Sequence, residues 1–328
     1  MKTSVLLLLV FLSSIPVAYA RQTPTGTPTA GSTPVPQPTP NFPRGGRGGT
    51  TPSIPVQDIV IPAQGSAPEG LALQQLIVHT YAQPLYRRPT EKELLDIAPP
   101  PGIANRYREF LKRPNTGIFR LAADSGCSEN SKVVNVNDNC LKYTMPGSGN
   151  SYSFRAGTYR IKDLADLNYS NNVLGVSGMM MNGILANLGD LPVENVSLQT
   201  RGVEYIAKFQ PPADFTAASA VNDQLVAGIQ KEGFLYRRFL PAVENSTYVL
   251  RAVAYHGKLF RSIHGVPYNE FDFDKRRDVI VAFRVAYRDA DGSLIIVWSQ
   301  LSNVDSPKLK LPPVSDGKKT NSRHPSKS

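Results

Sequence analysis

Residues 278–301 read DVIVAFRVAYRDADGSLIIVWSQL, and this stretch decides the fold. In its first half the apolar side chains alternate, so Val281 and Phe283 fall on one face of a strand and Ile280 and Ala282 on the other. The turn sequence DADG follows, and the run LIIVW leads back. Period-two alternation interrupted by an Asp-Gly turn predicts a β-hairpin. Because the returning strand is apolar on both faces, other elements must cover the hairpin on each side.

Residues 56–307 are expected to form one domain with a helical part at 66–113 and a β-rich part at 117–302. Ser66 and Thr90 begin capping boxes before apolar runs, and a third helix is expected at 103–112. Asp214 is expected to cap a later helix. Beyond residue 117 the period changes to two, which predicts strands at 118–121, 141–145, 152–159, 168–177, 203–209, 234–239, 248–255 and 259–263. The pattern predicts an α+β fold: a mostly antiparallel sheet, sandwich-like or single and twisted, with an N-terminal helical layer and one further helix packed on it.

Residues 1–20 have the pattern of a secretory signal peptide. Lys2 supplies the positive charge, residues 5–12 are apolar, and Ala18 and Ala20 form a small-x-small cleavage site. Cleavage is expected after Ala20; an uncleaved anchor is the alternative. The apolar run is too short for a permanent membrane span, and no later run is longer. We therefore expect an exported chain (periplasmic, cell-surface or extracellular) without a transmembrane segment after cleavage.

Residues 21–55 and 308–328 are expected to be disordered. Pro and Thr make up about half of 21–55, which contains no acidic residue. Such a composition buries too little apolar surface to offset the entropy of ordering, and it favours extended polyproline II. The plain interpretation of 21–55 is a passive linker. The alternatives are a Thr-glycosylated stalk, or a segment that touches a wall polymer through Arg21, Arg44 and Arg47.

The positive charge of the chain lies mainly at its ends. The whole sequence has 36 basic and 26 acidic residues, a net charge of +10. Residues 1–55 hold four of the basic residues and no acidic one, and 308–328 hold six and one, which leaves 26 and 25 for residues 56–307. A nearly neutral domain in an exported chain argues against nucleic acid as a partner. Salt-sensitive contact of the ends with anionic envelope polymers or lipid headgroups is the expectation.

The two cysteines, Cys127 and Cys140, bound a short polar segment between expected strands, and in an exported protein this predicts a disulfide bond. Two thiols without a nearby His or third Cys make an incomplete zinc site. The segment also carries oxygen ligands, for which a weak calcium site competes with ordinary turn chemistry: Asn135, Asn137, Asp138 and Asn139. No phosphate-binding or dinucleotide-binding glycine motif occurs, so we expect no cofactor.

Four residues are the candidates for a catalytic site. His256 and His264 flank an expected turn at 257–258, and Asp272 and Asp274 follow. On neighbouring strands two His and a carboxylate can converge as a metal-binding triad or as a general acid–base pair. The spacing matches no helix-borne zinc motif, and solvated His residues near a turn are the alternative. We therefore assign no metal site, and keep these residues as the site of an alternative function, an exported hydrolase.

An aromatic and basic cluster is the candidate binding surface. Tyr268, Phe271, Phe273 and Arg276 are close in sequence, and exposed aromatic rings beside basic groups mark binding patches. The sequence thus favours a non-enzymatic envelope or extracellular module that binds a polymer or protein partner while held on a flexible stalk. Three N-x-S/T sequons, which matter only in a host that glycosylates exported chains, occur at Asn168, Asn195 and Asn245.

Overall fold

The computed structural model describes residues 68–123, 145–176 and 178–310. The chain divides into two units between residues 62 and 63, and every described residue belongs to the second, Ala63–Ser328. The predicted signal peptide, linker, C-terminal tail and disulfide between Cys127 and Cys140 lie outside the described residues, as do four of the five residues of the strand expected at 141–145. Among the described residues, no helix is long and apolar enough to cross a membrane.

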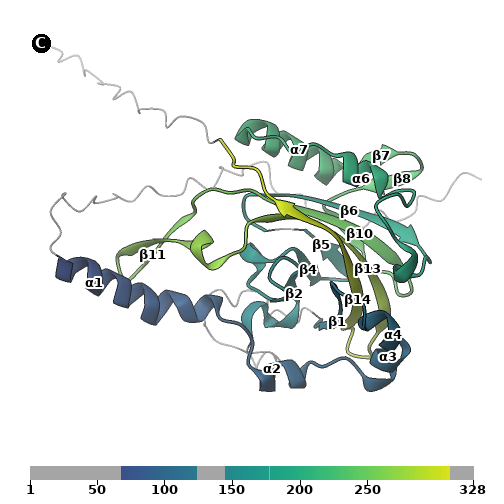
Figure 1. The fold of residues 1–328 in the computed structure, drawn as a ribbon, viewed down its shortest axis with the longest axis horizontal. Coiled ribbons are helices and arrows are strands. Elements are labelled where there is room, and N and C mark those ends of the chain that lie inside the picture. Colours follow the sequence, from purple (N-terminus) through teal and green to yellow (C-terminus); the bar gives the residue numbers. More distant parts are fainter. Residues whose placement is uncertain (1–67, 124–144, 177, 311–328) are drawn as a thin grey trace, which may run out of the picture. The chain divides into compact units, whose positions relative to one another are not determined.

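The predicted hairpin forms the centre of a five-stranded antiparallel sheet (Figure 1). Its strands are β13 (Arg277–Arg288) and β14 (Leu294–Asp305). In the turn between them Gly292 has a φ of 84°, a conformation that favours glycine. The sheet order is β1-β14-β13-β10-β6, and its other strands are β1 (Thr116–Leu121), β6 (Met181–Gly189) and β10 (Thr247–Ala254).

Both faces of the central hairpin are covered, as its apolar return strand requires. Val281 and Phe283 pack in one buried cluster, whereas Ile280 and Ala282 pack in a second cluster on the opposite face. The first cluster is shared with another five-stranded sheet, of order β3-β2-β4-β5-β9. Its strands are β2 (Ser151–Ser153), β3 (Thr158–Tyr159), β4 (Leu167–Ser170), β5 (Val173–Gly175) and β9 (Phe239–Pro241).

Helices contribute to the second cluster. They are α3 (Pro101–Arg106), α4 (Arg108–Leu111), α6 (Glu204–Lys208) and α7 (Phe215–Ala227), and a small hairpin, β7 (Ile229–Lys231) with β8 (Phe234–Tyr236), joins them. The side chain of Asp214 caps α7 as predicted, by accepting a hydrogen bond from the backbone of Ala217. The helix expected at 103–112 is divided between α3 and α4.

The strand expected at 203–209 is wrong, because most of these residues form α6. Val203 and Ile206 are both fully buried, and their spacing of three is that of a helix face. The guanidinium of Arg251 donates hydrogen bonds to the carbonyl oxygens of Ile206 and Phe209 at the end of this helix. Arg251 also pairs with the buried Asp278. A buried side chain from β10 thus stabilises the end of a helix that is too short to be stable alone.

The N-terminal helical region begins with α1 (Pro68–Ile77), which continues as a π-helix, η1 (Val78–Ala82), and a 3₁₀ turn, η2 (Gln83–Tyr86). Next comes α2 (Glu91–Asp96), whose predicted capping box at Thr90 is present. Further 3₁₀ turns are η3 (Pro146–Gly149), η4 (Lys162–Leu164), η5 (Val193–Asn195) and η6 (Glu270–Phe273). The fold is therefore mostly antiparallel β-sheet with few helices and an N-terminal helical region.

Candidate binding site

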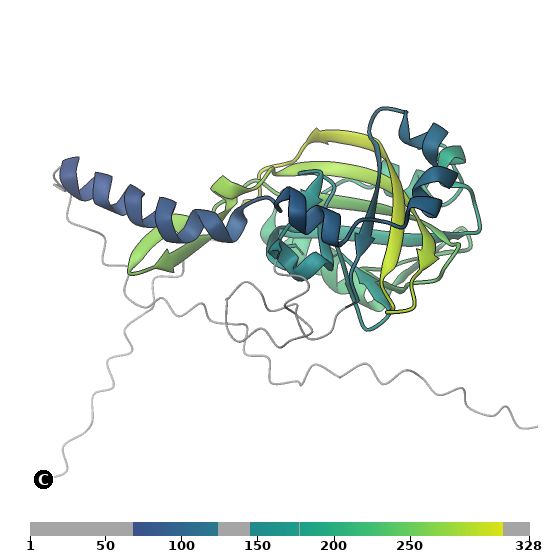
Figure 2. The same ribbon diagram turned by 90° about the horizontal axis from the view of Figure 1, so that it is seen from below.

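One helix and one hairpin lie side by side beyond the end of the two sheets (Figures 1 and 2). The hairpin consists of β11 (Phe260–Ile263) and β12 (Val266–Asn269), and the helix is α1 with η1. We call residues 68–82 and 260–269 the arm, and the two five-stranded sheets with the helices on them the body. The hairpin turns at His264 and Gly265, both with positive φ, as a two-residue turn of this kind requires.

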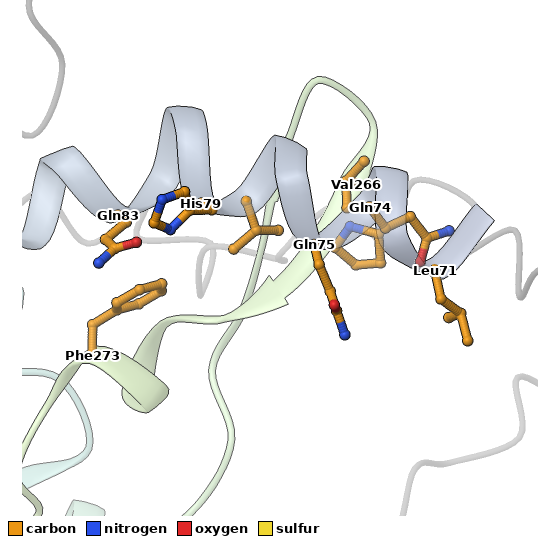
Figure 3. A pocket seen from close by; sticks show the side chains of 9 residues that line it. Leu71, Gln74, Gln75, His79, Gln83, Val266 and Phe273 are labelled. Atoms are coloured by element: carbon orange, nitrogen blue, oxygen red, sulfur yellow. The ribbon is translucent and has the colours of Figure 1, made fainter. Parts of the chain in front are cut away.

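A groove of about 330 Å³ lies between α1 and the hairpin. Figure 3 shows Phe273 and Gln83 at one end of this groove and Leu71 at the other, with His79 between them. The remaining lining residues are Gln74, Gln75, Val78, Val266 and Pro267. The lining is thus apolar with neutral amide groups and one imidazole, and it contains no Asp, Glu, Lys or Arg.

The helical part of the arm carries apolar side chains in contact with solvent and, after Glu69, no charge. From Gly70 to Tyr86 the sequence contains no Asp, Glu, Lys or Arg. Leu71 is 52% exposed, and Leu73 and Leu76 are each 58% exposed. A surface helix of a monomeric protein normally has one polar face, and contiguous exposed apolar surface marks sites of interaction.

Polar contacts around η2, η4 and η6 join the arm to the body, and we call this region the joint. The Tyr86 hydroxyl donates a hydrogen bond to the carboxylate of Glu270 at 3.1 Å and lies 2.9 Å from the hydroxyl of Tyr268. Arg261 pairs with Glu270 at 2.7 Å and with Asp163 at 3.0 Å. Burial, the hydrogen bond with Tyr268 and the charge of Glu270 all raise the pKa of Tyr86, so its hydroxyl remains a donor at neutral pH.

Directly behind this joint lies a buried charge cluster of two arginines and two aspartates. Arg155 pairs with Asp166 at 2.5 Å and with Asp274 at 2.6 Å, and these three side chains have no solvent exposure. Arg276 pairs with the same Asp274 at 2.9 Å. Burial and the neighbouring Arg155 lower the pKa of Arg276 to about 10.

The buried charge cluster fixes the segment that connects the hairpin to β13. Arg276 donates hydrogen bonds to the carbonyl oxygens of Met179, Met180 and Tyr255, and its guanidinium lies 3.9 Å from the ring centre of Phe271. Burying charges costs free energy that an apolar cluster would not, and such clusters are best explained by the geometry they impose. In this protein the buried charge cluster fixes the position of the arm relative to the body.

The candidate catalytic residues are not joined to one another by any contact that the described residues show. His256 is exposed at the end of β10, whereas His264 is at the turn of the hairpin, where its ring centre lies 4.3 Å from that of Tyr81. Asp272 accepts a hydrogen bond from Asn269, and Asp274 is held between two arginines. The turn expected at 257–258 lies instead at 264–265, so strand β11 separates the two His residues. No group of three His, Cys, Asp or Glu among the described residues is placed to hold a metal ion.

The expectation that the aromatic and basic cluster is exposed is wrong for two of its members. Phe271 and Arg276 are 5% and 6% exposed, because they form the interior of the joint between arm and body. Tyr268 is half-buried against Tyr86, and Phe273 is half-buried and lines the groove. Only Phe273 of the four therefore contributes to the groove.

The three sequons differ in their exposure to solvent. Asn168 is buried in β4, whereas Asn195 and Asn245 are exposed. A glycan on Asn168 would therefore conflict with the packing of the second sheet.

The sequence pattern does not predict the groove, although it contains one signal for it. A run of 17 residues without charge in a helix that is not the core of the domain already indicates a surface with an unusual role. That signal marks the helix but not the hairpin opposite it. Comparison of the chain with protein-family models, with curated proteins and with solved structures finds no match.

Proposed function

We propose that this chain is an exported, non-enzymatic module that binds another protein by taking an uncharged, apolar segment of it into the groove between α1 and β12. The observation that carries the proposal is a groove without charge on an arm whose position is fixed by buried ion pairs. If the groove were only a chance gap between mobile elements, buried ion pairs that fix the position of the arm would not be required.

The chemistry of the groove defines its occupant. An ionised side chain that entered it would lose hydration and find no opposite charge, which is costly. Apolar side chains of a partner would bury Leu71, Val266 and Phe273 from water. The amides of Gln74 and Gln75 can both donate and accept hydrogen bonds, as the backbone of a bound peptide requires. A short apolar peptide segment therefore fits better than an anionic polymer.

The expected export of the chain determines where this binding takes place. The proposed signal peptide is cleaved after Ala20, and residues 21–55 then act as a flexible stalk that leads towards α1. The module works in the periplasm, at the cell surface or outside the cell, with a disulfide between Cys127 and Cys140 and a sandwich-like pair of sheets as scaffold. The alternative, a hydrolase using His256 and His264, has no observation in its favour, because its residues lie on either side of strand β11.

Co-sedimentation of the mature chain 21–328 with isolated envelope material, at low and at high salt, tests the proposal. The key variant is Leu71→Asp, which places a carboxylate in the groove. The matched control is Leu73→Asp, which makes the same change on the same helix at a similarly exposed leucine. At 100° per residue, its side chain points about 200° away from that of Leu71.

We expect the wild type and Leu73→Asp to pellet at both salt concentrations, when the protein is dilute. Leu71→Asp is expected to weaken binding by roughly tenfold or more, since burying an unpaired charge costs more than about 1.4 kcal/mol. Release of all three proteins by salt would instead assign the binding to the basic ends of the chain. Equal binding of both variants in high salt would contradict a role of the groove.

A further inference from the structure

One side chain of the groove can change its charge near neutral pH. His79 lines the groove and is exposed to solvent. Figure 3 shows its ring next to Gln83 along the helix, with the ring of Phe273 on the opposite side. The imidazole is the side chain that ordinarily gains a proton between pH 5 and 8. None of the other lining residues is titratable. The lining is therefore neutral when His79 is neutral, and it carries one positive charge when His79 is protonated.

No charged side chain of the lining can compensate this positive charge. The titratable groups on the elements packed around the groove lie outside its lining; beyond α1 they are Tyr81, Tyr86, Arg261, His264, Tyr268, Glu270 and Asp272. Glu270 already accepts a hydrogen bond from Tyr86 and pairs with Arg261, and Asp272 accepts one from Asn269. Glu69, at the start of α1, is ten residues before His79, which is about 15 Å along a helix.

An apolar segment in the groove would cover the imidazole and remove water from it. The protonated ring would then lose its hydration without gaining an opposite charge, which is costly. The neutral ring loses less, and it can exchange hydrogen bonds with the amides of Gln75 and Gln83. We propose that His79 makes binding in the groove depend on pH: the neutral imidazole admits the apolar segment, and protonation of His79 releases it. This inference rests on the proposed function and adds the regulation of the same site.

The expected size of the effect follows from competition between the proton and the bound segment. Because each disfavours the other, acid weakens binding, and binding displaces the proton. A histidine of ordinary pKa, about 6.5, is roughly 10% protonated at pH 7.5 and roughly 90% protonated at pH 5.5. When the neutral form alone binds, the apparent affinity is reduced by the fraction of protein in that form. Acidification from pH 7.5 to 5.5 therefore weakens binding by about tenfold.

Co-sedimentation of the mature chain 21–328 with isolated envelope material, in high salt at pH 7.5 and at pH 5.5, tests the inference. High salt suppresses attraction by the basic ends of the chain. We expect the dissociation constant of the wild type to be about tenfold higher at pH 5.5. In His79→Gln, which is neutral at both pH values, the ratio of the two constants should be close to one. The matched control is His264→Gln, which removes the imidazole at the hairpin turn, outside the groove lining, and should keep the tenfold ratio.

His79→Lys gives a second measurement, because a lysine keeps its positive charge at both pH values. This variant should bind about tenfold more weakly than the wild type at pH 7.5, with a ratio close to one. Equal binding of the wild type at both pH values, or wild-type affinity of His79→Lys at pH 7.5, would overturn the inference and leave the proposed function intact. Acid release that persists in His79→Gln would assign it to other groups and also overturn the inference. A wild type that does not pellet in high salt at pH 7.5 would contradict the proposed function itself, and the inference with it. Circular dichroism at both pH values checks that each variant keeps its fold.

Discussion

The body and the arm place the same residue type in opposite surroundings. Leu250 in β10 is completely buried between the two sheets, whereas Leu73 on α1 is 58% exposed. Burial of a leucine stabilises a fold by roughly 1.5–3 kcal/mol, which accounts for Leu250. Burial on folding does not explain Leu73 in this way, because its side chain stays exposed. Apolar residues in the arm are therefore best explained by what the arm binds.

The distribution of charged side chains also differs between the arm and the joint behind it. The helix of the arm is exposed and carries no charge from residue 70 to 86, whereas the joint behind it buries Arg155, Asp166 and Asp274 completely. In most proteins charged side chains are exposed to water and apolar side chains are buried. The comparison suggests that the body and its joint provide stability and position, and that the arm provides recognition. Three predictions test this division.

The largest effect is expected for Arg155→Ala. This substitution removes the partner of Asp166 and one of the two partners of Asp274, and it leaves buried carboxylates without sufficient opposite charge. Breaking a buried ion pair in this way costs about 3–5 kcal/mol, measurable by urea unfolding at neutral pH. Hydrogen exchange should also become faster in the arm, because Asp274 belongs to the segment that holds the hairpin.

The control for this prediction is Arg277→Ala, which removes an ion pair with the exposed Asp305. Its effect should be at most about 1 kcal/mol. If Arg155→Ala were as mild as Arg277→Ala, or left exchange in the arm unchanged, the joint would not be what positions the arm.

The second prediction compares the two leucines directly. Leu250→Ala is expected to lower the free energy of unfolding by about 2–5 kcal/mol, because it leaves a cavity in the shared core. Leu73→Ala removes the same atoms from a solvent-exposed helix face, and its effect should be within about 0.5 kcal/mol. Urea unfolding of dilute protein measures both. A clear loss of stability in Leu73→Ala would mean that this side chain serves folding, and the division between body and arm would fail.

The sequence predicts the parts of this fold that depend on local pattern. The hairpin of β13 and β14 has alternating apolar residues and its own turn sequence, so neighbouring residues specify it. The capping box of Thr90 is equally local. At 203–209 the pattern fits both a strand and a helix, and the decision comes from Arg251, more than 40 residues away.

The arm could be predicted only in part for the same reason. Its helix begins in a region with a clear apolar pattern, but the groove requires a hairpin about 190 residues later in the chain. The buried charge cluster joins Arg155 to Asp274, 119 residues apart. Arg276 is two residues from Asp274, but nothing in the sequence indicates that the distant Arg155 pairs with the same carboxylate, and the sequence therefore leaves Asp274 as a catalytic candidate.

Among the substitutions of buried side chains, the smallest effect is expected for Tyr86→Phe, which sharpens the boundary between arm and body. The substitution removes the hydroxyl that donates to the buried Glu270, and should cost about 1–2 kcal/mol near pH 8. Burial raises the pKa of Tyr86 in the folded protein above its ordinary value of 10. Above pH 10 the unfolded chain therefore releases a proton that the folded chain retains, and the wild type loses stability as the pH rises.

Because Tyr86→Phe lacks this ionisation, its stability should fall less steeply above pH 10, and the difference from wild type should narrow. Urea unfolding at pH 8, 10 and 11 measures both slopes, with Tyr81→Phe on the arm as the matched control. Parallel slopes for wild type and Tyr86→Phe would mean that this hydroxyl is not held protonated by the joint. The polar contacts would then belong to the arm's surface, and the buried charge cluster alone would connect the arm to the body.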